Sequence, residues 1–594
     1  MATTYDKASL VMIPSGVKES KLYSIKPTDG SGDFTFSRGT DTATRVNSSG
    51  LIEKERSNQI LHSNDFTNAA WIKSAVNVTG SQTDPNGGST AALFQNTATS
   101  NAYVYQVKSG AATCSVYAKA GTRSTFVILN GIFNNGASFD LSAETTSTSG
   151  AGVISKIEDV GGDWYRCSVY VTSKSNFLIG LSDISGGGSV IGDNMTFAFP
   201  QSEPNSIVAT DYIETTTAAV YEGITDNLPR LDYSGGASCP SLLLEPSRSN
   251  LIYHSEYLDG APFKSRLIVT DNATTSPEGV QNAGKIVATS VSGSHALDYI
   301  PSVIATDYSM SIYAKAGELS KFVLLTNNRG TNMARGFDVS NGTTFANDLG
   351  YGEPTSYSIE AVGNDWYYCT IQFPKTSAGT AGMGVYLNND SGNYSFVGND
   401  VDGMYFWGWQ AELGSYPTSY IPTYGTSASR AADSCEVTGA SDLIGETEGT
   451  IAGEFTFKST EGTNRLFSIS GADWNTIGHI RFDMISLRPQ AKIRSTGADI
   501  AEVIGTEDIA IGSVVKFAVV YTSTTFKMFV NGAQIGSTDT LSGSLPSPMN
   551  EIVVDALGGA FSSPTQNNQL NPYKQALVFK TALTDAEAIA LTTI

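Results

Sequence analysis

Cationic side chains are scarce in this sequence, in which 36 Lys and Arg residues stand against 57 Asp and Glu residues, for a formal net charge of -21. A field of that sign repels phosphate backbones and anionic lipid surfaces. We therefore expect no nucleic acid partner and no membrane insertion, and no apolar run reaches transmembrane length. Residues 1–16 contain Asp6 and only a short apolar run, which does not fit a secretory signal.

Cysteine is also sparse and scattered. The five residues form no Cys-x-x-Cys pair, and they are Cys114, Cys167, Cys239, Cys369 and Cys435. This pattern indicates neither a zinc site nor a disulfide framework, and we expect folding in a reducing cytosol. The few histidines have no second ligand or nucleophile nearby in sequence, so we expect no metal cluster, no triad and no cofactor.

Short strands and tight turns are what the sequence has in abundance. A chain of 594 residues exceeds one ordinary core, so several domains are expected. With 59 Gly, 27 Tyr and 26 Phe, the composition favours an all-β fold. Asn531-Gly532 predicts a hairpin turn, and residues 583–591 predict one short helix capped by Thr584 or Asp585.

An internal repeat organises most of the chain. Four blocks recur in the same order: residues 53–63 as 245–255, 115–121 as 311–317, 162–167 as 364–369, and 211–213 as 419–421. The surrounding segments alternate apolar and polar residues, as half-buried strands do. We predict two homologous jelly-roll-like β-sandwiches.

The predicted domain boundaries follow from these repeats. They are an N-terminal segment at 1–52, copy one at 53–220, a linker at 221–242 packed on the next domain, copy two at 243–436, and a further sandwich at 437–594. The apolar run at 228–233 explains why the linker should pack rather than float free.

Several segments resemble structural proteins of tailed bacteriophages. They are residues 8–16, 23–30 and 34–40, and then 43–53 with 227–233 and 242–252. The last three are similar to one segment that is continuous in many of those proteins, so copy one interrupts it, as an insertion in a surface loop would. The resemblance implies a virion protein, assembled in the host cytoplasm, with residues 1–50 docking it on the particle.

Two later segments extend the resemblance. Residues 406–414 and 417–423 look like the closing strand of carbohydrate-binding-like sandwiches in phage tail and fibre proteins, and the counterpart at 201–213 looks degraded. The C-terminal unit resembles concanavalin A-like, laminin-G-type lectin domains. The family implies a tail fibre or surface adhesin that binds host-surface glycans beside other virion proteins, as a homo-oligomer and most plausibly a trimer.

Two rival functions stay open at this stage. A polysaccharide depolymerase would need paired carboxylates facing one cleft, and residues 437–594 show no such strand, so we expect no enzyme. A purely structural decoration or joining protein would contact only other virion proteins. Between the copies, the sequence favours copy two and the C-terminal unit as the working end.

The candidate ligand contacts are aromatic. Trp407 and Trp409 lie two residues apart, which places them on one sheet face as core, interface or ligand platform. Trp474 occupies a predicted loop, where a large ring suggests ligand contact. Acidic turns at 389–392 and 399–402 could hold Ca²⁺, although solvated turns are the better interpretation.

Overall fold

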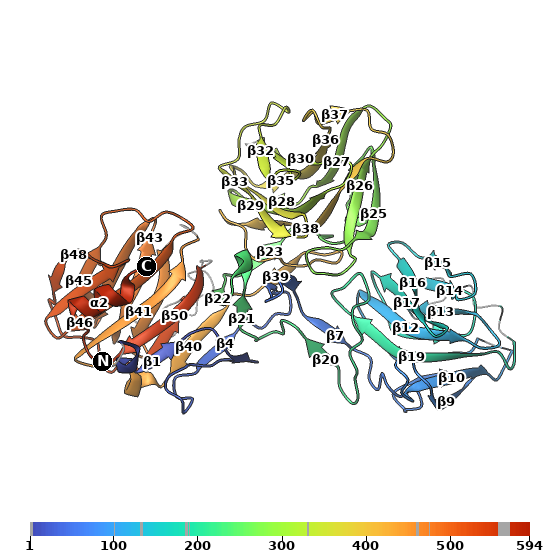
Figure 1. Cartoon of the computed structure of the whole chain (residues 1–594), viewed down its shortest axis with the longest axis horizontal. Helices are drawn as coiled ribbons and strands as arrows, with labels where there is room; N and C mark the ends of the chain where they lie inside the picture. The colour runs from blue at the N-terminus through green and yellow to red at the C-terminus, as the bar shows by residue number, and fades with distance from the viewer. Residues whose placement is uncertain are drawn as a thin grey trace.

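The computed structural model describes residues 4–99, 101–130, 135–184, 188, 190–328, 332–458, 463–473, 476–555 and 571–594. Figure 1 shows three β-sandwich lobes, with both chain ends in the left-hand lobe. The predicted all-β architecture, with tandem sandwiches and a further sandwich that ends the chain, is confirmed. No helix in the described part of the chain is both long enough and apolar enough to cross a membrane.

The left-hand lobe, here called the base, consists of two facing sheets. One runs β21 (Arg230–Asp232), β22 (Ser241–Leu244), β50 (Asn571–Phe579), β41 (Glu448–Thr456), β46 (Val514–Thr522), β47 (Thr525–Val530) and β48 (Ala533–Thr540), with β1 (Leu10–Met12) also on β50. The other runs β2 (Val17–Lys18), β3 (Lys21–Leu22), β4 (Phe34–Ser37), β40 (Ser434–Thr438), β49 (Glu551–Val554), β42 (Thr463–Ser470), β43 (Gly478–Ile485), β44 (Arg488–Ser495) and β45 (Ala498–Ile504).

The base therefore draws strands from three distant parts of the chain, and this corrects the predicted domain boundaries. Residues 1–52 are not a separate segment, because β1 pairs with β50 and β4 pairs with β40. The linker packs on the base rather than on copy two, because β22 pairs with β50. The buried core shared by both sheets includes Leu10, Met12, Leu22, Phe34 and Phe36 from the N-terminal segment and Leu231, Leu242 and Leu244 from the linker.

Local signals in the base are confirmed. Asn531 and Gly532 have positive φ of 48° and 83° and join β47 to β48, as an Asn-Gly hairpin turn requires. The helix α2 (Asp585–Thr592) starts at Thr584, whose hydroxyl accepts from the Glu587 amide while the Glu587 carboxylate accepts from the Thr584 amide. Short helical turns elsewhere are α1 (Thr4–Lys7), η1 (Ser234–Gly236), η2 (Leu258–Gly260) and η3 (Ala440–Leu443).

Copy one, the right-hand lobe, is a sandwich of two sheets. The first runs β16 (Ile154–Gly161), β17 (Trp164–Val171), β12 (Ala112–Ala120), β19 (Asn194–Glu203), β10 (Ala91–Asn96) and β9 (Val76–Gln82). The second runs β15 (Thr145–Ser149), β14 (Gly136–Asp140), β13 (Thr125–Leu129), β18 (Asn176–Gly180), β11 (Tyr103–Val107) and β8 (Ile72–Ser74).

Copy two, the upper lobe, repeats this plan. Its first sheet runs β25 (Leu267–Thr274), β26 (Ala283–Ala288), β38 (Gly403–Leu413), β29 (Thr306–Ala316), β34 (Trp366–Lys375) and β33 (Ser356–Gly363). Its second runs β24 (Phe263–Ser265), β27 (Gly293–Tyr299), β36 (Gly382–Asn388), β30 (Lys321–Asn327), β31 (Met333–Asp338) and β32 (Thr343–Phe345), with β37 (Ser395–Phe396) on β27. Two of the four two-stranded sheets in the described residues are β28 (Ser302–Val303) with β35 (Gly379–Thr380), and β5 (Arg45–Val46) with β6 (Ile52–Glu53).

Each copy leaves the base and returns to it through one antiparallel pair of strands, here called a neck. Neck one pairs β7 (Arg56–Asn58) with β20 (Val220–Glu222), and neck two pairs β23 (Arg248–Asn250) with β39 (Ala428–Arg430). Both copies are thus inserted into one sandwich rather than strung before it. The sequence pointed to such an interruption for copy one alone.

The repeated sequence blocks form a buried polar latch at the root of each copy. In copy one, Asn58 donates to the carbonyls of Pro200 and Ile213 and accepts from the Ile60 and Ser202 amides. Gln201 accepts from the Ile213 amide, and Glu203 accepts from the Thr210 amide. Copy two makes the same bonds with Asn250, Gln410 and Glu412. Burial requires these polar groups to be paired, which explains why the blocks recur.

A second buried polar group, here called the arginine cluster, joins the base to the root of copy two. Arg230 contacts Glu245 at 2.5 Å and also pairs with Asp433, and Arg430 lies 3.0 Å from Glu245. Arg38 lies 3.4 Å from Asp433. All five side chains are 0% exposed, so each charge depends on its partners in the cluster.

Glu55, next to neck one, gives the fold a pH-dependent element. Burial, followed by the nearby Asp41 and Asp226 carboxylates, raises the pKa of Glu55 to about 8. The folded state therefore binds this proton more tightly than the unfolded state does. Stability from this group is complete below the usual glutamate pKa of 4.5 and is lost as pH rises from 4.5 to 8, by up to about 1.4 kcal/mol per pH unit.

We therefore expect Glu55→Gln to raise the melting temperature at pH 9 and to leave it nearly unchanged at pH 4.5. Glutamine keeps the shape of the protonated side chain and removes the charge. Thermal unfolding followed by circular dichroism at both pH values tests this. An equal change in melting temperature at both pH values would show that the charge of Glu55 does not cause it.

Candidate functional site

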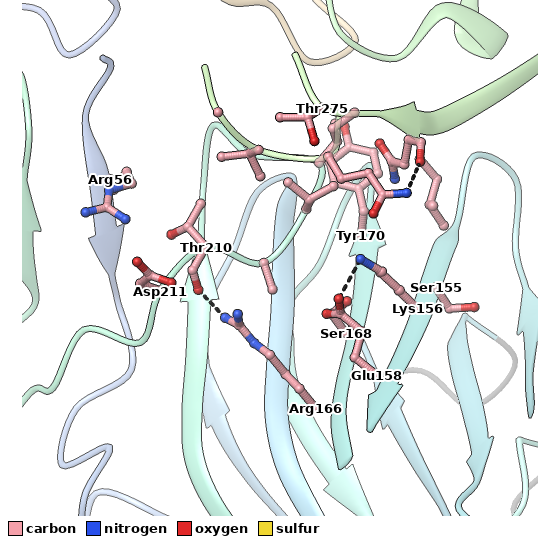
Figure 2. Close-up of a pocket in the computed structure, with 18 residues that line it drawn as sticks. Arg56, Ser155, Lys156, Glu158, Arg166, Ser168, Tyr170, Thr210, Asp211 and Thr275 are labelled. Atoms are coloured by element: carbon pink, nitrogen blue, oxygen red, sulfur yellow. Dashed lines mark hydrogen bonds and ion pairs between the residues drawn. The ribbon is translucent and has the colours of Figure 1, made fainter. Parts of the chain in front are cut away.

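A polar cleft lies between copy one and copy two. Its cavity has a volume of 410 Å³. The lining residues, all drawn as sticks in Figure 2, are Arg56, 154–156, Glu158, Arg166, Ser168, Tyr170, 207–211, Asn272, Thr275 and 279–281. This volume is in the range of sites that hold small molecules or parts of larger ligands.

Copy one supplies the main wall through the outer faces of β16 and β17. Three cross-strand pairs line it: Ile154 opposite Tyr170, Lys156 opposite Ser168, and Glu158 opposite Arg166. They share one face because side chains alternate along a strand. In Figure 2, Arg166, Ser168 and Tyr170 follow one strand, with Lys156 and Glu158 on its neighbour. The wall therefore combines hydroxyl, charged and apolar groups.

The other sides come from three separate segments. Residues 207–211 of copy one border the wall, residues 272–281 of copy two face it, and Arg56 comes from neck one. In Figure 2, Thr275 lies on the copy two side of the cleft, and Thr210 and Asp211 lie beside Arg166. The cleft exists only where the two sandwiches meet.

Most charges in the cleft are balanced by the protein itself. Lys156 contacts Glu158 at 2.6 Å, and Arg56 contacts Glu222 at 3.1 Å. The Arg166 guanidinium donates to the Thr210 carbonyl and lies 5.5 Å from the centroid of the Tyr117 ring. The uncharged polar lining includes serine, threonine, asparagine and glutamine side chains, which donate and accept hydrogen bonds. Such a lining suits a polyhydroxylated ligand better than a multiply charged one.

Tyr170 stands out within this wall. Its side chain is only 2% exposed, and its buried hydroxyl has no hydrogen-bond partner in the described part of the protein. Burial, with a smaller contribution from Tyr257, raises the pKa of Tyr170, so the hydroxyl is a neutral donor. A buried hydroxyl without a partner is costly. The hydroxyl atom is itself covered by protein, where Tyr170 packs against Tyr257 of copy two at the inner end of the cleft.

Copy two lacks the corresponding wall. The matching pairs on β33 and β34 are Ser356 with Gln372, Ser358 with Thr370, and Glu360 with Tyr368. Ser358 and Thr370 bond to each other at 2.8 Å. Copy one is thus the main contributor to the cleft, whereas the sequence favoured copy two and the C-terminal unit.

The expectation that Trp407 and Trp409 share one sheet face is wrong. Gly408 between them has φ of 63° and forms a bulge, where the pairing of β29 with β38 shifts register. Trp409 packs into the copy two core, while Trp407 packs on the opposite face against Tyr313 and Tyr420. Both are 0% exposed, so neither ring can contact a ligand in this structure. Trp474 lies outside the described residues.

The closing strand of copy one, β19, is not degraded: it keeps an aromatic ring at the position of Trp407, but a different residue supplies the ring. Ala198 and Phe199 stand where copy two has Trp407 and Gly408. Phe199, with φ of 53°, lies 4.6 Å from Tyr212 and 5.4 Å from Tyr117 between ring centroids. The Trp407 ring makes the matching contacts in copy two. One aromatic ring fills the same position in both copies, from adjacent residues.

The acidic turns use their side-chain oxygens locally. Asn389 accepts from the Asn393 amide, Asn399 from the Val401 and Asp402 amides, and Asp400 from the Ser290 amide. Within the described ranges, no group of three or more His, Cys, Asp and Glu side chains is arranged to hold a metal ion.

Comparisons with known proteins add only distant likenesses. No protein-family model matches the chain, and neither does any curated protein. Similar solved structures include the CBM40 of Ruminococcus gnavus IT-sialidase bound to α2,3-sialyllactose, with 16% identity, 26% of this chain and 87% of that chain covered, and a TM-score of 0.22.

Two further solved structures are similar at the same level. The Streptococcus pneumoniae NanB sialidase shows 17% identity over 27% of this chain and 26% of its own, with a TM-score of 0.21. A heptameric SAP-like pentraxin from Limulus polyphemus shows 15% identity over 25% of this chain and 70% of its own, with a TM-score of 0.20. Likenesses this weak support no inference about function.

Proposed function

We propose that the chain is a non-enzymatic virion protein of a tailed bacteriophage, a tail fibre or surface adhesin that binds host-surface glycans. The observation that carries the glycan part is the cleft, where Lys156 pairs with Glu158, Arg56 pairs with Glu222, and serine, threonine and amide groups line the wall. Sugars are held by such convergent hydrogen bonds together with apolar contact, which Ile154, Val208 and Val280 provide.

The virion assignment rests on the sequence resemblance, and the architecture fits it. Two sandwiches project from one base on separate necks. We propose that the whole base, rather than residues 1–52 alone, faces the particle and other virion proteins. In this proposal the chain assembles as a homo-oligomer, a trimer, which would multiply weak contacts into avidity.

Binding of the purified full-length chain to host cells and to a glycan array tests this proposal. Gln281 is exposed in the cleft, so Gln281→Trp should fill part of the cleft and raise the dissociation constant at least about tenfold. Thr79→Trp is the matched control, because Thr79 is exposed on β9 at the far edge of the same copy one sheet. Absence of saturable binding by the wild type would favour a purely structural role.

Two further measurements separate the rivals. Sustained release of reducing ends from host polysaccharide would identify a depolymerase and contradict the non-enzymatic proposal. Antibody labelling of intact particles should place the protein at the tail. A label scattered over the head would favour a decoration protein.

Tyr170→Phe gives a sharp test of the cleft itself. The hydroxyl bonds to no described protein group, so its removal should leave the melting temperature unchanged or slightly raised. If the Tyr170 side chain turns on binding so that its buried hydroxyl reaches a glycan oxygen, affinity should fall about fivefold to tenfold. Calorimetric titration of both forms with the best array ligand measures this. Unchanged affinity would exclude the hydroxyl from the binding site.

A further inference from the structure

A buried ion cluster, here called the lysine cluster, lies where the chain enters copy one. The Lys54 ammonium lies 2.9 and 3.1 Å from the two carboxylate oxygens of Glu256 and 3.1 Å from the Glu278 carboxylate. It also donates to the Tyr424 hydroxyl at 2.9 Å. The Asn282 amide donates to both carboxylates. The three charged side chains are at most 6% exposed, so their charges depend on one another.

The lysine cluster joins two parts of the molecule. Lys54 lies two residues before neck one, whereas both carboxylates belong to copy two. The residues before Lys54 also pack on copy two: the Ile52 amide donates to the Pro277 carbonyl at 2.9 Å, and Leu51 fills the space beside Gly279. The segment that leads into copy one is therefore held on copy two up to the start of neck one.

The direct contact between the two sandwiches is small and adjoins the lysine cluster. Its buried side chains are Tyr170, Ile207 and Val208 of copy one and Tyr257 of copy two. Tyr424, which accepts a hydrogen bond from Lys54, packs partly buried against the same group. Because four buried side chains make a limited contact, we expect the orientation of copy one to depend on the cluster beside it.

The lysine cluster is not part of the repeated sandwich plan. When the first repeated block is aligned, the counterpart of Lys54 is Pro246, and the counterpart of Glu256, just beyond the block, is Asn64. Asn64 bonds to Glu214 within copy one instead. Copy one thus forms the same sandwich without these ions, so the cluster is not needed for the sandwich to fold.

The two carboxylates of the lysine cluster need the Lys54 ammonium. Without it, Glu256 and Glu278 would be buried without a counter-charge, which is strongly unfavourable. The loop that carries Glu278 lies against Leu51 and Ile52. A shift of the segment around Lys54 away from copy two would therefore admit water to the carboxylates. That shift carries neck one with it and separates the sandwiches, without opening the apolar core of either.

From these contacts we propose that Lys54 is a positioning residue: its ammonium holds copy one docked on copy two, and loss of that charge releases copy one to move on neck one. The cleft exists only where the sandwiches meet, so the lysine cluster decides whether the cleft is assembled. This goes beyond the proposed function, because it concerns the arrangement of the two lobes and holds whatever the cleft binds.

Single-molecule energy transfer on the full-length protein tests this without a ligand. The exposed Cys239 is replaced by Ser, and dyes are attached to Thr79→Cys on β9 of copy one and Ala361→Cys on β33 of copy two, both exposed positions. We expect the protein with Lys54 to give one narrow population of transfer efficiency. Lys54→Met should move most molecules to a second, broader population, because the freed lobe samples many orientations.

Two further variants separate the effect of charge from that of shape. In Lys54→Met/Glu256→Gln/Glu278→Gln no buried charge is left uncompensated, so the single narrow population should return. Lys119→Met is the matched control, because Lys119 pairs with the exposed Asp163 within copy one, and it should leave the population unchanged. Thermal unfolding followed by circular dichroism shows whether each variant folds.

Three results would overturn this inference. The first is a single unchanged population in folded Lys54→Met. The second is loss of cooperative unfolding in Lys54→Met, which would make the cluster part of the fold of copy two. The third is a triple variant that moves as Lys54→Met does, which would attribute the movement to side-chain shape. Because no ligand is present, failure of the wild type to bind glycans would leave the inference standing.

Discussion

A fragment restricted to residues 437–594 is expected to be unfolded. It lacks β1 and β22, which pair directly with β50, and it lacks β4 together with residues 434–436 of β40, to which β4 pairs. Nine buried side chains from the missing segments, Cys435 among them, would be absent from the core. Loss of one such side chain costs about 2–5 kcal/mol, and whole domains are stable by only about 5–15 kcal/mol. Circular dichroism and limited proteolysis of the fragment measure the result.

The control instead removes copy one and keeps every strand of the base. Val220 lies opposite Asn58 in neck one, so a short Gly/Ser turn can replace residues 59–219. All base strands remain, and this variant should fold and unfold cooperatively. A stable, protease-resistant 437–594 fragment would contradict the discontinuous base.

Asp433→Ala is expected to destabilise the base by about 3–5 kcal/mol. The substitution removes one of two carboxylates from the arginine cluster, so Arg38 loses its carboxylate partner and the three buried guanidinium groups share Glu245 alone. It also removes the acceptor for the Glu245 amide, which donates at 2.9 Å. Urea unfolding gives the free energy. Glu222→Ala, which breaks the partly exposed pair with Arg56, should cost less than about 1 kcal/mol.

The same cluster predicts that the folded state loses stability at acidic pH. Burial acts to raise the pKa of Glu245, but the Arg430 and Arg230 guanidinium groups outweigh burial and lower the pKa to about 2. This contribution is complete above the ordinary value of 4.5 and is lost as pH falls from 4.5 to 2. Glu245→Gln, which has no titrating carboxyl, should therefore flatten the loss of stability between pH 4.5 and 2. If wild type and variant lose stability in parallel below pH 4.5, the cluster is not its source.

Features encoded over short distances were predictable from sequence. The repeat, the Asn531-Gly532 hairpin and the Thr584 cap depend on neighbouring residues, so composition and spacing revealed them. The repeated polar residues were recognisable as blocks, but their joint function as a latch was not. It requires Asn58 to meet residues more than a hundred positions away.

Features that depend on distant pairing were missed. Nothing local in residues 10–12 indicates that they add to a strand near the end of the chain. The cleft was not predicted because its residues lie on the outer faces of two separate sandwiches. The sequence does not show that these two faces lie against each other. Trp407 and Trp409 were misplaced because alternation was assumed through Gly408, although a glycine within a strand is itself a signal for a bulge.

The two necks have a consequence for how such a protein changes over time. Because each copy begins and ends on adjacent strands, recombination at two closely spaced points can delete, duplicate or exchange an entire lobe without opening either sheet of the base. The existing pair records one such duplication. The base can then stay unchanged while a whole lobe is replaced. A lobe with a different surface can be gained in one step without any change to the core of the base.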